Sequence, residues 1–384
     1  MTFVHSVFLG LIPRRTAFSA FEPESLAPTL RTGSAARVTS TQTRTRQIVP
    51  YRFAILPHDN THSSSERYEN AARVIMERMT LDPSTTDVLV IGGAGFIGSH
   101  IADSLVDDAD VTVYDDLSTG HAENLHPDVS LRNDTIKNAE RLTASVERAD
   151  IVFHLAAQVS VQRSIEGPVP SHETNLDPIL TILEAARGSD TRVVFASSAA
   201  IYGEPEYTPI DEDHPKEPNS PYGLEKLTAD HYCRLYHDLY DVEAVALRYF
   251  NVYGPRQQAG DYSGVISIFR EQARAGDSIT VEGDGTQTRD FVHVDDVVQA
   301  NLLAATADDA PGKGINVGTG TEITIRELAE AVKEATNSDS EIVHLETREG
   351  DIAESVADIS RARETLGYDP EYDVYEGIEA YLGE

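Results

Sequence analysis

Short apolar runs and amphipathic stretches alternate along the chain after residue 85. The apolar runs are rich in β-branched residues, as is typical of strands buried on both faces of a parallel sheet. They cover residues 87–91, 111–115, 151–157 and 192–198, with a shorter strand around 129–131. Apolar residues at helical spacing predict helices after residue 95, over 171–188 and from 222 to about 240. This alternation predicts an α/β fold built on a doubly wound, Rossmann-type parallel sheet.

A glycine-rich turn joins the first strand to the first helix. Gly92, Gly95 and Gly98 give the spacing GxxGxxG between them. The first glycine permits a tight turn, the second lets the backbone approach a pyrophosphate, and the third lets the helix pack close to the sheet. Free N–H groups at the start of the helix would face the phosphates, so the turn predicts a dinucleotide site.

An acidic residue ends the second strand. Asp115 lies 17 positions after Gly98, where a carboxylate can accept hydrogen bonds from ribose hydroxyls. An acid at this position also repels a 2′-phosphate, so NAD is expected rather than NADP, and a strand-end cap is the alternative role. Asp134 follows the strand around 129–131 and is expected either to reach the adenine or to cap a turn.

Two serines end the strand 192–198, and a tyrosine and a lysine follow on the next helix. Tyr222 and Lys226 are at i and i+4, so their side chains share one helical face. A neighbouring ammonium favours phenolate and lowers the pKa of a tyrosine, which would make Tyr222 a base at neutral pH. Amphipathic packing explains the same spacing, and turn capping explains serines such as Ser198. The glycine turn upstream favours the catalytic interpretation.

Charge divides the chain near residue 80. Residues 1–79 carry ten arginines, no lysine and six acidic residues, whereas the rest carries 21 basic and 58 acidic residues. The first segment is rich in Ser, Thr, Arg and Pro, and shows no sustained period. We expect residues 1–84 to be a disordered or non-native extension, with Met76 or Met79 as the natural start. A targeting peptide is the alternative.

The net charge of −33 bears on surroundings and partners. Nucleic acid is not expected as a partner, because a phosphate backbone is bound through clustered Lys and Arg. Such acidity is typical of a protein kept soluble in a salty cytoplasm, where salt screens self-repulsion. The single Cys233 excludes an intrachain disulfide, and no apolar run approaches the roughly 18 residues of a membrane span. His154 and His293 lack metal-ligand spacing, so satisfied structural roles are expected.

Seven motifs together resemble the extended short-chain dehydrogenase/reductase family, and look most like its UDP-glucose 4-epimerase group. They are GGAGFIGS, YDDLSTG, FHLAA, SSAAIYG, YGLEK, LRYFNVYGPRQ and TRDFVHVDD, in the order and spacing of the family. The match covers roughly residues 86–381 and leaves out the N-terminal segment. The resemblance implies an NAD-dependent enzyme that acts on a sugar nucleotide.

The same resemblance implies roles for individual residues. Ser198 would orient the 4-OH of the sugar, Tyr222 would be the base, and Lys226 its partner, which also grips the nicotinamide ribose. The NAD site would comprise Gly92, Gly95, Phe96, Ile97, Gly98, Asp115, Asp134, Leu155, Ala156, Ala157, Tyr222 and Lys226. The sugar nucleotide would be held by Ser198, Asn251, Arg289, Arg348, Asp351 and Ser355. Guanidinium forks suit a diphosphate, although surface ion pairs with the abundant acids are the alternative for both arginines.

Alanines follow Ser198 where related dehydratases and decarboxylases carry carboxylates. Expelling a hydroxyl needs a general acid, and Ala199 and Ala200 offer none. The resemblance therefore favours C4 epimerisation of UDP-glucose and UDP-galactose through a transient 4-keto sugar. Group members restricted to plain hexoses carry a bulky aromatic where Ser355 stands, so UDP-GlcNAc and UDP-GalNAc are expected as further substrates. The alternatives are another oxidoreductase or epimerase of the family, such as a UDP-glucuronate 4-epimerase, and a non-catalytic NAD-sensing module.

Domain limits and assembly follow from the same resemblance. Residues 85–254 plus 289–312 would form the NAD-binding domain, and 255–288 plus 313–384 a smaller C-terminal sugar-nucleotide-binding lobe. The helices over 171–188 and 222–240 would pair across the axis of a homodimer. We thus predict NAD as cofactor, a UDP-sugar as small-molecule partner, and neither a metal nor a membrane contact.

Overall fold

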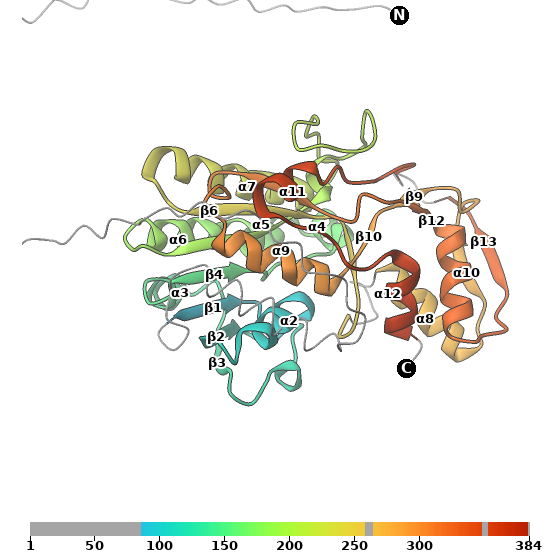
Figure 1. Ribbon diagram of the computed structural model, residues 1–384, viewed down its shortest axis with the longest axis horizontal. Coiled ribbons are helices and arrows are strands. Elements are labelled where there is room, and N and C mark those ends of the chain that lie inside the picture. The colour runs from blue at the N-terminus through green and yellow to red at the C-terminus, as the bar shows by residue number, and fades with distance from the viewer. Residues whose placement is uncertain (1–85, 258–263, 348–351, 383–384) are drawn as a thin grey trace, which may run out of the picture. The chain divides into compact units, whose positions relative to one another are not determined.

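A seven-stranded sheet forms the centre of the computed structural model, which describes residues 86–257, 264–347 and 352–382. Every strand pair in this sheet is parallel, in the order β11-β6-β5-β4-β1-β2-β3 (Figure 1). The strands are β1 (Asp87–Ile91), β2 (Asp110–Asp115), β3 (Ser130–Asn133), β4 (Ile151–His154), β5 (Arg192–Ser198), β6 (Ala244–Tyr249) and β11 (Gly314–Val317). The predicted α/β class and Rossmann-type sheet are confirmed. The expectations for residues 1–84 lie outside the described residues.

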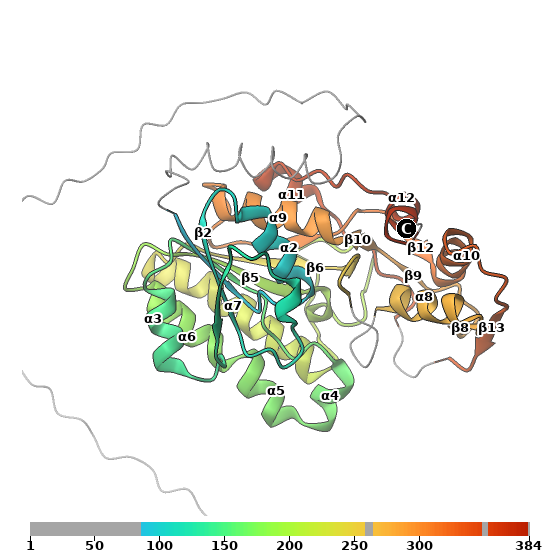
Figure 2. The ribbon, with the colours of Figure 1, turned by 90° about the horizontal axis from the view of Figure 1, so that it is seen from below.

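Helices cover both faces of the sheet (Figure 2). One face packs against α2 (Phe96–Leu105), α9 (Val294–Thr306) and α11 (Ser360–Leu366). The other packs against α3 (Ala139–Val146), α6 (Asp177–Ala186) and α7 (Pro221–Tyr240). The strands are buried from both sides, which explains why their sequences are continuous apolar runs rather than alternating ones.

A smaller lobe has an apolar core of its own. Its elements are α8 (Val265–Ala275), β8 (Ile279–Glu282), α10 (Ile325–Ala335), β13 (Ile342–Leu345) and α12 (Val374–Leu382). The connections to the large sheet contain β7 (Asn251–Tyr253), β9 (Thr288–Arg289), β10 (Phe291–His293) and β12 (Ile323–Thr324). No helix among the described residues has the length and apolar character that crossing a membrane requires.

The expected lobe boundary at residue 313 is wrong. Strand β11 was expected in the small lobe, but it pairs with β6 as an edge strand of the large sheet. Ile315 and Val317 of this strand are fully buried in the main core, and Ala362 and Leu366 of α11 pack there too. The chain therefore returns to the large domain twice after leaving it, because these apolar side chains complete the core around α9.

Two predicted elements are shorter than their sequence pattern. Strand β4 ends at His154, because the N–H groups of Leu155 and Ala156 both donate to the carbonyl of Ile91 and turn the chain. The helical pattern over 171–188 is divided into α5 (Pro168–Asn175) and α6. Pro178 in the first turn of α6 has no N–H to donate, which favours a new helix start at this point.

A buried ion pair joins α7 to the sheet. Arg248 of β6 donates from Nε and Nη2 to the two carboxylate oxygens of Asp230, at 2.9 and 3.1 Å. Arg234 adds a third bond at 3.0 Å, and Ser197 of β5 donates to the same carboxylate at 3.3 Å. Asp230 is fully buried, and its partners hold the pKa of its carboxyl below the ordinary value despite burial. The pair thus sets the position of α7 on strands β5 and β6.

Replacing Arg248→Leu should lower the free energy of unfolding by about 3 kcal/mol, since it leaves a buried carboxylate short of its main partner. The measurement is urea unfolding at constant salt, compared with Arg326→Leu, which removes an exposed pair with Glu330. The control should unfold close to wild type. Equal midpoints for the two variants would show that the pair does not hold α7 in place.

Candidate active site

The glycine turn has the geometry that its spacing predicts. Gly92 has φ +82°, and a Cβ there would lie 2.6 Å from the nitrogen of Ala156. A Cβ on Gly98 would lie 2.3 Å from the carbonyl oxygen of Gly92, so α2 packs tightly against the turn. A Cβ on Gly95 would meet only that same oxygen, at 3.2 Å, so the space beyond it is open. No side chain caps the N terminus of α2, which starts at this open position and suits a pyrophosphate.

The carboxylate of Asp115 lies directly beside this turn. It accepts hydrogen bonds from the N–H of Ala94 at 3.0 Å and of Leu117 at 2.8 Å. Burial raises the pKa of Asp115, and the two backbone donors oppose that rise. The acid is therefore held at the edge of the turn, where a dinucleotide ribose would come within reach.

The structure supports the turn-cap alternative for Asp134. Its carboxylate accepts from the N–H of Thr135 at 2.9 Å and forms an ion pair with Arg141 at 2.8 Å. The hydrogen bond from Arg141 lowers the pKa of the Asp134 carboxyl. A contact between Asp134 and an adenine stays a prediction.

Tyr222 and Lys226 lie in the first turns of α7, both facing the sheet. Ser220 caps the helix, its hydroxyl accepting from the N–H of Gly223 at 3.2 Å, and the N–H of Tyr222 donates to Ser164. The ammonium of Lys226 donates to the carbonyl of Ala196 on β5 at 2.7 Å. It lies 5.9 Å from the ring centre of Tyr222. Both side chains are more than nine-tenths buried.

The pKa of Tyr222 is raised, contrary to the expectation that Lys226 lowers it. Burial is the largest cause, Ser198 hydrogen-bonds the phenol and lowers its pKa, and Glu225 raises it further. Burial also lowers the pKa of Lys226, to about 8, which Glu225 opposes.

Ser198 lies where β5 ends, and its oxygen accepts from the N–H of Ala200 at 3.2 Å. This bond caps the short helix η3 (Ala199–Ile201), so the turn-capping role is present. The hydroxyl proton is still available to a sugar hydroxyl or to the phenol oxygen of Tyr222. Ser198 and the phenol of Tyr222 are therefore hydrogen-bonding neighbours, and Ala199 and Ala200 place no carboxylate directly after Ser198.

A buried carboxylate that is not among the predicted site residues belongs to Glu225, directly before Lys226 on α7. Glu225 is 5% exposed, and it accepts from Ser171 Oγ and Asn175 Nδ2, each at 2.7 Å. Asn175 also bonds both main-chain groups of Gln158, at 2.8 and 3.0 Å. A signal was present in the sequence, because Glu225 falls on the same helical face as Tyr222.

Three of the predicted substrate residues come from segments that lie side by side. The N–H of Ser355 donates to the carbonyl of Thr288, and that of Asp290 donates to the carbonyl of Ser355, so Ser355 runs alongside Arg289. Asn251 Nδ2 donates to the carbonyl of Asp290 at 2.9 Å. The side chains of Arg348 and Asp351 lie outside the described residues.

The two histidines differ from each other. His293 accepts from the N–H of Asp295 at 3.3 Å, as a structural residue does. His154 is 1% exposed, and neither of its ring nitrogens has a hydrogen-bond partner among the described residues, so the satisfied role expected for it is wrong. Burial and the charge of Lys226 lower the pKa of His154 to about 3, which keeps the ring neutral.

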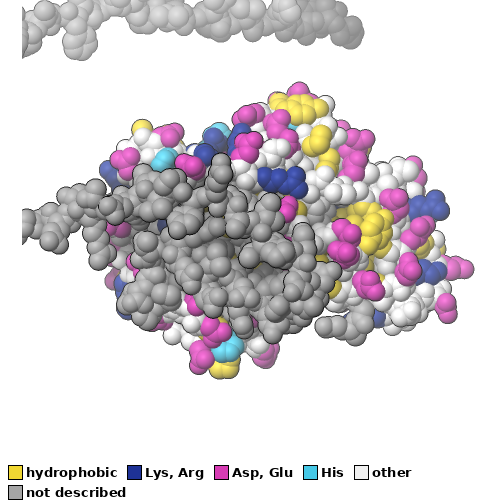
Figure 3. Space-filling view, in the orientation of Figure 1, with side chains coloured by type: hydrophobic (Ala, Val, Ile, Leu, Met, Phe, Trp, Pro, Cys, Tyr) yellow, Lys and Arg dark blue, Asp and Glu magenta, His cyan; other side chains and the backbone are white. Residues whose placement is uncertain are grey.

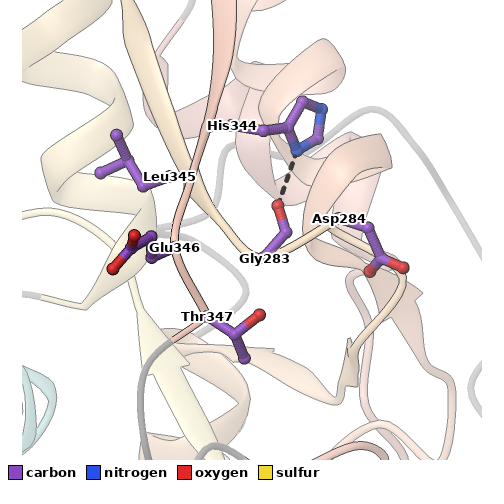
Figure 4. Close-up of a pocket in the computed structure, with 6 residues that line it drawn as sticks. All are labelled: Gly283, Asp284, His344, Leu345, Glu346 and Thr347. Atoms are coloured by element: carbon purple, nitrogen blue, oxygen red, sulfur yellow. Dashed lines mark hydrogen bonds between the residues drawn. The ribbon is translucent and has the colours of Figure 1, made fainter.

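An open hollow lies away from the catalytic candidates, at the ends of β8 and β13 in the small lobe (Figure 4). It is lined by Gly283, Asp284, His344, Leu345, Glu346 and Thr347. His344 bonds the carbonyl of Gly283 at 2.9 Å, so its ring is held at the wall. No cluster suited to a metal ion occurs within the described ranges.

Residues 88–318 match the NAD dependent epimerase/dehydratase family. The UDP-glucose 4-epimerase of Mycolicibacterium smegmatis is 39% identical over 299 residues, which cover 76% of this chain and 95% of that protein. A UDP-N-acetylglucosamine 4-epimerase from Methanobrevibacter ruminantium has a similar structure, with TM-score 0.75, 37% identity and coverage of 78% and 97%. The Thermus thermophilus UDP-glucose 4-epimerase, solved with NAD, gives TM-score 0.71, 39% identity and coverage of 77% and 98%.

The variant Gly98→Ala should weaken NAD binding by about tenfold or more. Its Cβ would collide with the carbonyl oxygen of Gly92 and push α2 away from the turn. Calorimetric titration of nucleotide-free protein measures the effect. The matched control is Gly188→Ala, whose Cβ would make an ordinary 3.5 Å contact. Unchanged affinity in Gly98→Ala would exclude the turn as the pyrophosphate site.

Proposed function

Because the chain belongs to the NAD dependent epimerase/dehydratase family, we propose that it is an NAD-dependent UDP-sugar 4-epimerase. The observation that carries the proposal is the convergence of Ser198, Tyr222 and Lys226 at the end of β5, with Lys226 held 2.7 Å from the carbonyl of Ala196. The absence of a carboxylate at Ala199 and Ala200 favours epimerisation over dehydration. The glycine turn and Asp115 would hold the NAD.

The proposed chemistry assigns one proton transfer to the chain. Ser198 orients the 4-OH of the sugar by a hydrogen bond, and Tyr222 as phenolate accepts its proton. NAD, held by the glycine turn and Asp115, would supply reversible hydride transfer at C4 of the sugar. Tyr222 keeps the proton until it returns to the oxygen at C4. The hydrogen bond from Ser198 favours the phenolate, and the Lys226 ammonium grips the nicotinamide ribose.

Epimerisation requires the 4-keto sugar to rotate in the site while its nucleotide stays bound. Arg289 and Asn251 lie on adjoining segments beside Ser355 and would hold the diphosphate together with Arg348. Asp351 is a further proposed contact of the sugar nucleotide. A guanidinium binds a diphosphate through two parallel hydrogen bonds, which leaves the sugar as the loosely held part. The UDP-sugar is thus anchored at one end, as epimerisation requires.

Incubation with UDP-glucose and no added cofactor should yield UDP-galactose, resolved by NMR. Tyr222→Phe should lower turnover by about 10²- to 10⁴-fold, because it removes the proton acceptor. Tyr207→Phe is the control, since it removes an exposed phenol that bonds Asp211. Accumulation of NADH with a stable keto product would contradict the proposal and favour a net oxidoreductase, and conversion of UDP-glucuronate alone would favour a uronate epimerase.

The proposed range of substrates depends on the size of the side chain at Ser355. Its small side chain leaves room for an N-acetyl group beside Arg289, so UDP-GlcNAc should be converted as well as UDP-glucose. Ser355→Tyr should reduce kcat/KM for UDP-GlcNAc by about tenfold or more and leave that for UDP-glucose nearly unchanged. If both activities stayed unchanged in the variant, the steric explanation would be wrong.

Assembly and surroundings complete the proposal. Apolar side chains on α5 and α7 are exposed, among them Val169 at 67% and Leu239 at 59%, which supports a homodimer through these helices. A molecular mass in solution equal to that of one chain would contradict the homodimer.

Asp and Glu far outnumber Lys and Arg on the visible face of the described residues (Figure 3), as suits a salty cytoplasm. The measurement is the free energy of unfolding as a function of KCl concentration. If it did not rise up to molar KCl, the adaptation to a salty cytoplasm would be excluded.

A further inference from the structure

We infer that Glu225 is a positioning residue for the catalytic pair, which supplies the counter-charge of Lys226 and ties α7 to the segment that follows β4. The inference rests on the proposed function and adds a residue to its site. Glu225 stands directly before Lys226 on α7 and one turn after Tyr222. Its role follows from its contacts, its burial and the scarcity of other charges around the pair.

The contacts of Glu225 lead from the catalytic helix to the predicted cofactor segment. Ser171 and Asn175 of α5 donate to the carboxylate at 2.7 Å each, which is the short distance of charge-assisted bonds. Asn175 in turn holds the main chain of Gln158 through two bonds. Gln158 directly follows Leu155, Ala156 and Ala157, the three residues of this segment that are predicted to contact NAD. One buried carboxylate thus positions α7, α5 and the cofactor segment together.

Both donors to the carboxylate are neutral groups, so they do not cancel its charge. Burying a charge costs free energy unless an opposite charge lies nearby. The nearby cation is Lys226, whose ammonium is itself buried. Glu225 raises the pKa of Lys226 and of Tyr222, which is what a negative charge close to both groups does.

Other titratable groups on and beside α7 leave this influence unopposed. His154 at the end of β4 is neutral, with its pKa lowered to about 3, and burial raises the pKa of the Cys233 thiol so that it stays protonated. The charge of Asp230 is matched by Arg234 and by Arg248 of β6. Glu225 is therefore the charged side chain that shifts the pKa of both catalytic candidates.

Charged groups on the neighbouring helices are engaged elsewhere. On α5, His172 and Glu173 form surface pairs with Asp177 and Lys137. On α4 (Val161–Glu166), Gln162 donates to Glu166. On α6, the carboxylate of Glu184 accepts from Tyr236 and pairs with Arg187. Arg163 is a further charged residue of α4. Lys216, in the loop before α7, lies near Asp230 and Arg234 and donates to the carbonyls of Glu212 and His214.

The variant Glu225→Gln keeps the shape and removes the charge. The pKa values of Tyr222 and Lys226 should both fall, so both limbs of the pH profile of kcat/KM for UDP-glucose should move to lower pH, by about one unit. Glu173→Gln makes the same charge change on the surface of α5 and should leave the limbs in place. A purely structural role would lower the rate without moving either limb, and that result would overturn the inference.

A second readout needs no turnover. Lys226 binds its proton more weakly when folded, with a pKa of about 8 against the ordinary 10.5, so the free energy of unfolding rises with pH between these values. In Glu225→Gln this rise should begin at lower pH than in Glu173→Gln, as followed by urea unfolding. Onset at the same pH in both variants would refute the counter-charge role.

The two measurements separate this inference from the proposed function. If the wild type failed to convert any UDP-sugar, the proposed function would fall, and the unfolding data would still decide whether Glu225 acts on Lys226. Should Glu225→Gln not fold, Glu225→Ser makes the same charge change and leaves room for water to meet Ser171 and Asn175. In Glu225→Ser, the limbs of the pH profile of kcat/KM and the pH at which the free energy of unfolding begins to rise should shift in the same direction as in Glu225→Gln. If neither shifted in this variant, the inference would be overturned.

Discussion

The buried ion pair between Asp230 and Arg248 is the contact on which the geometry of the candidate site depends. Two charges withdrawn from water are stable only when each meets its partner in good geometry, so the pair fixes the position of α7 on β6. Ser197, which bonds the same carboxylate, directly precedes Ser198. The contact therefore sets the distance between the serine at the end of β5 and the tyrosine and lysine of the helix.

Burial then decides how these groups titrate. Tyr222 and Lys226 both lose hydration, which raises the pKa of the phenol and lowers that of the ammonium toward neutrality. A base buried in this way needs nearby groups that stabilise its charged form, and Ser198 does so through its hydroxyl. Glu225 acts in the opposite sense on the phenol while keeping the lysine protonated. The balance between these neighbours, rather than the tyrosine and lysine alone, determines the reactive form.

The path of the chain brings two of the proposed substrate residues, Arg289 and Ser355, side by side. After β11 returns to the large sheet, the chain builds part of the small lobe and comes back at residues 352–359. There Asp290 accepts from the N–H groups of Thr319, Gly320 and Ala357, which fastens this returning segment beside β9. Ser355 thereby lies alongside Arg289. The same fastening links the large sheet to the small lobe, so the predicted sugar and diphosphate positions are coupled to the core.

The sequence alone determined the features that depend on local spacing: the glycine turn, the strands that end in Asp115 and Ser198, and the shared face of Tyr222 and Lys226. These could be predicted because periodicity and turn chemistry act over a few residues. Only the tertiary structure decided that β11 joins the large sheet, that Glu225 meets Ser171 and Asn175, and that burial raises the pKa of Tyr222. It also decided that the ring nitrogens of His154 have no hydrogen-bond partner in the part of the chain that the structure describes. Each of these depends on contacts between residues far apart in the chain and on the loss of water around them, which no local pattern records.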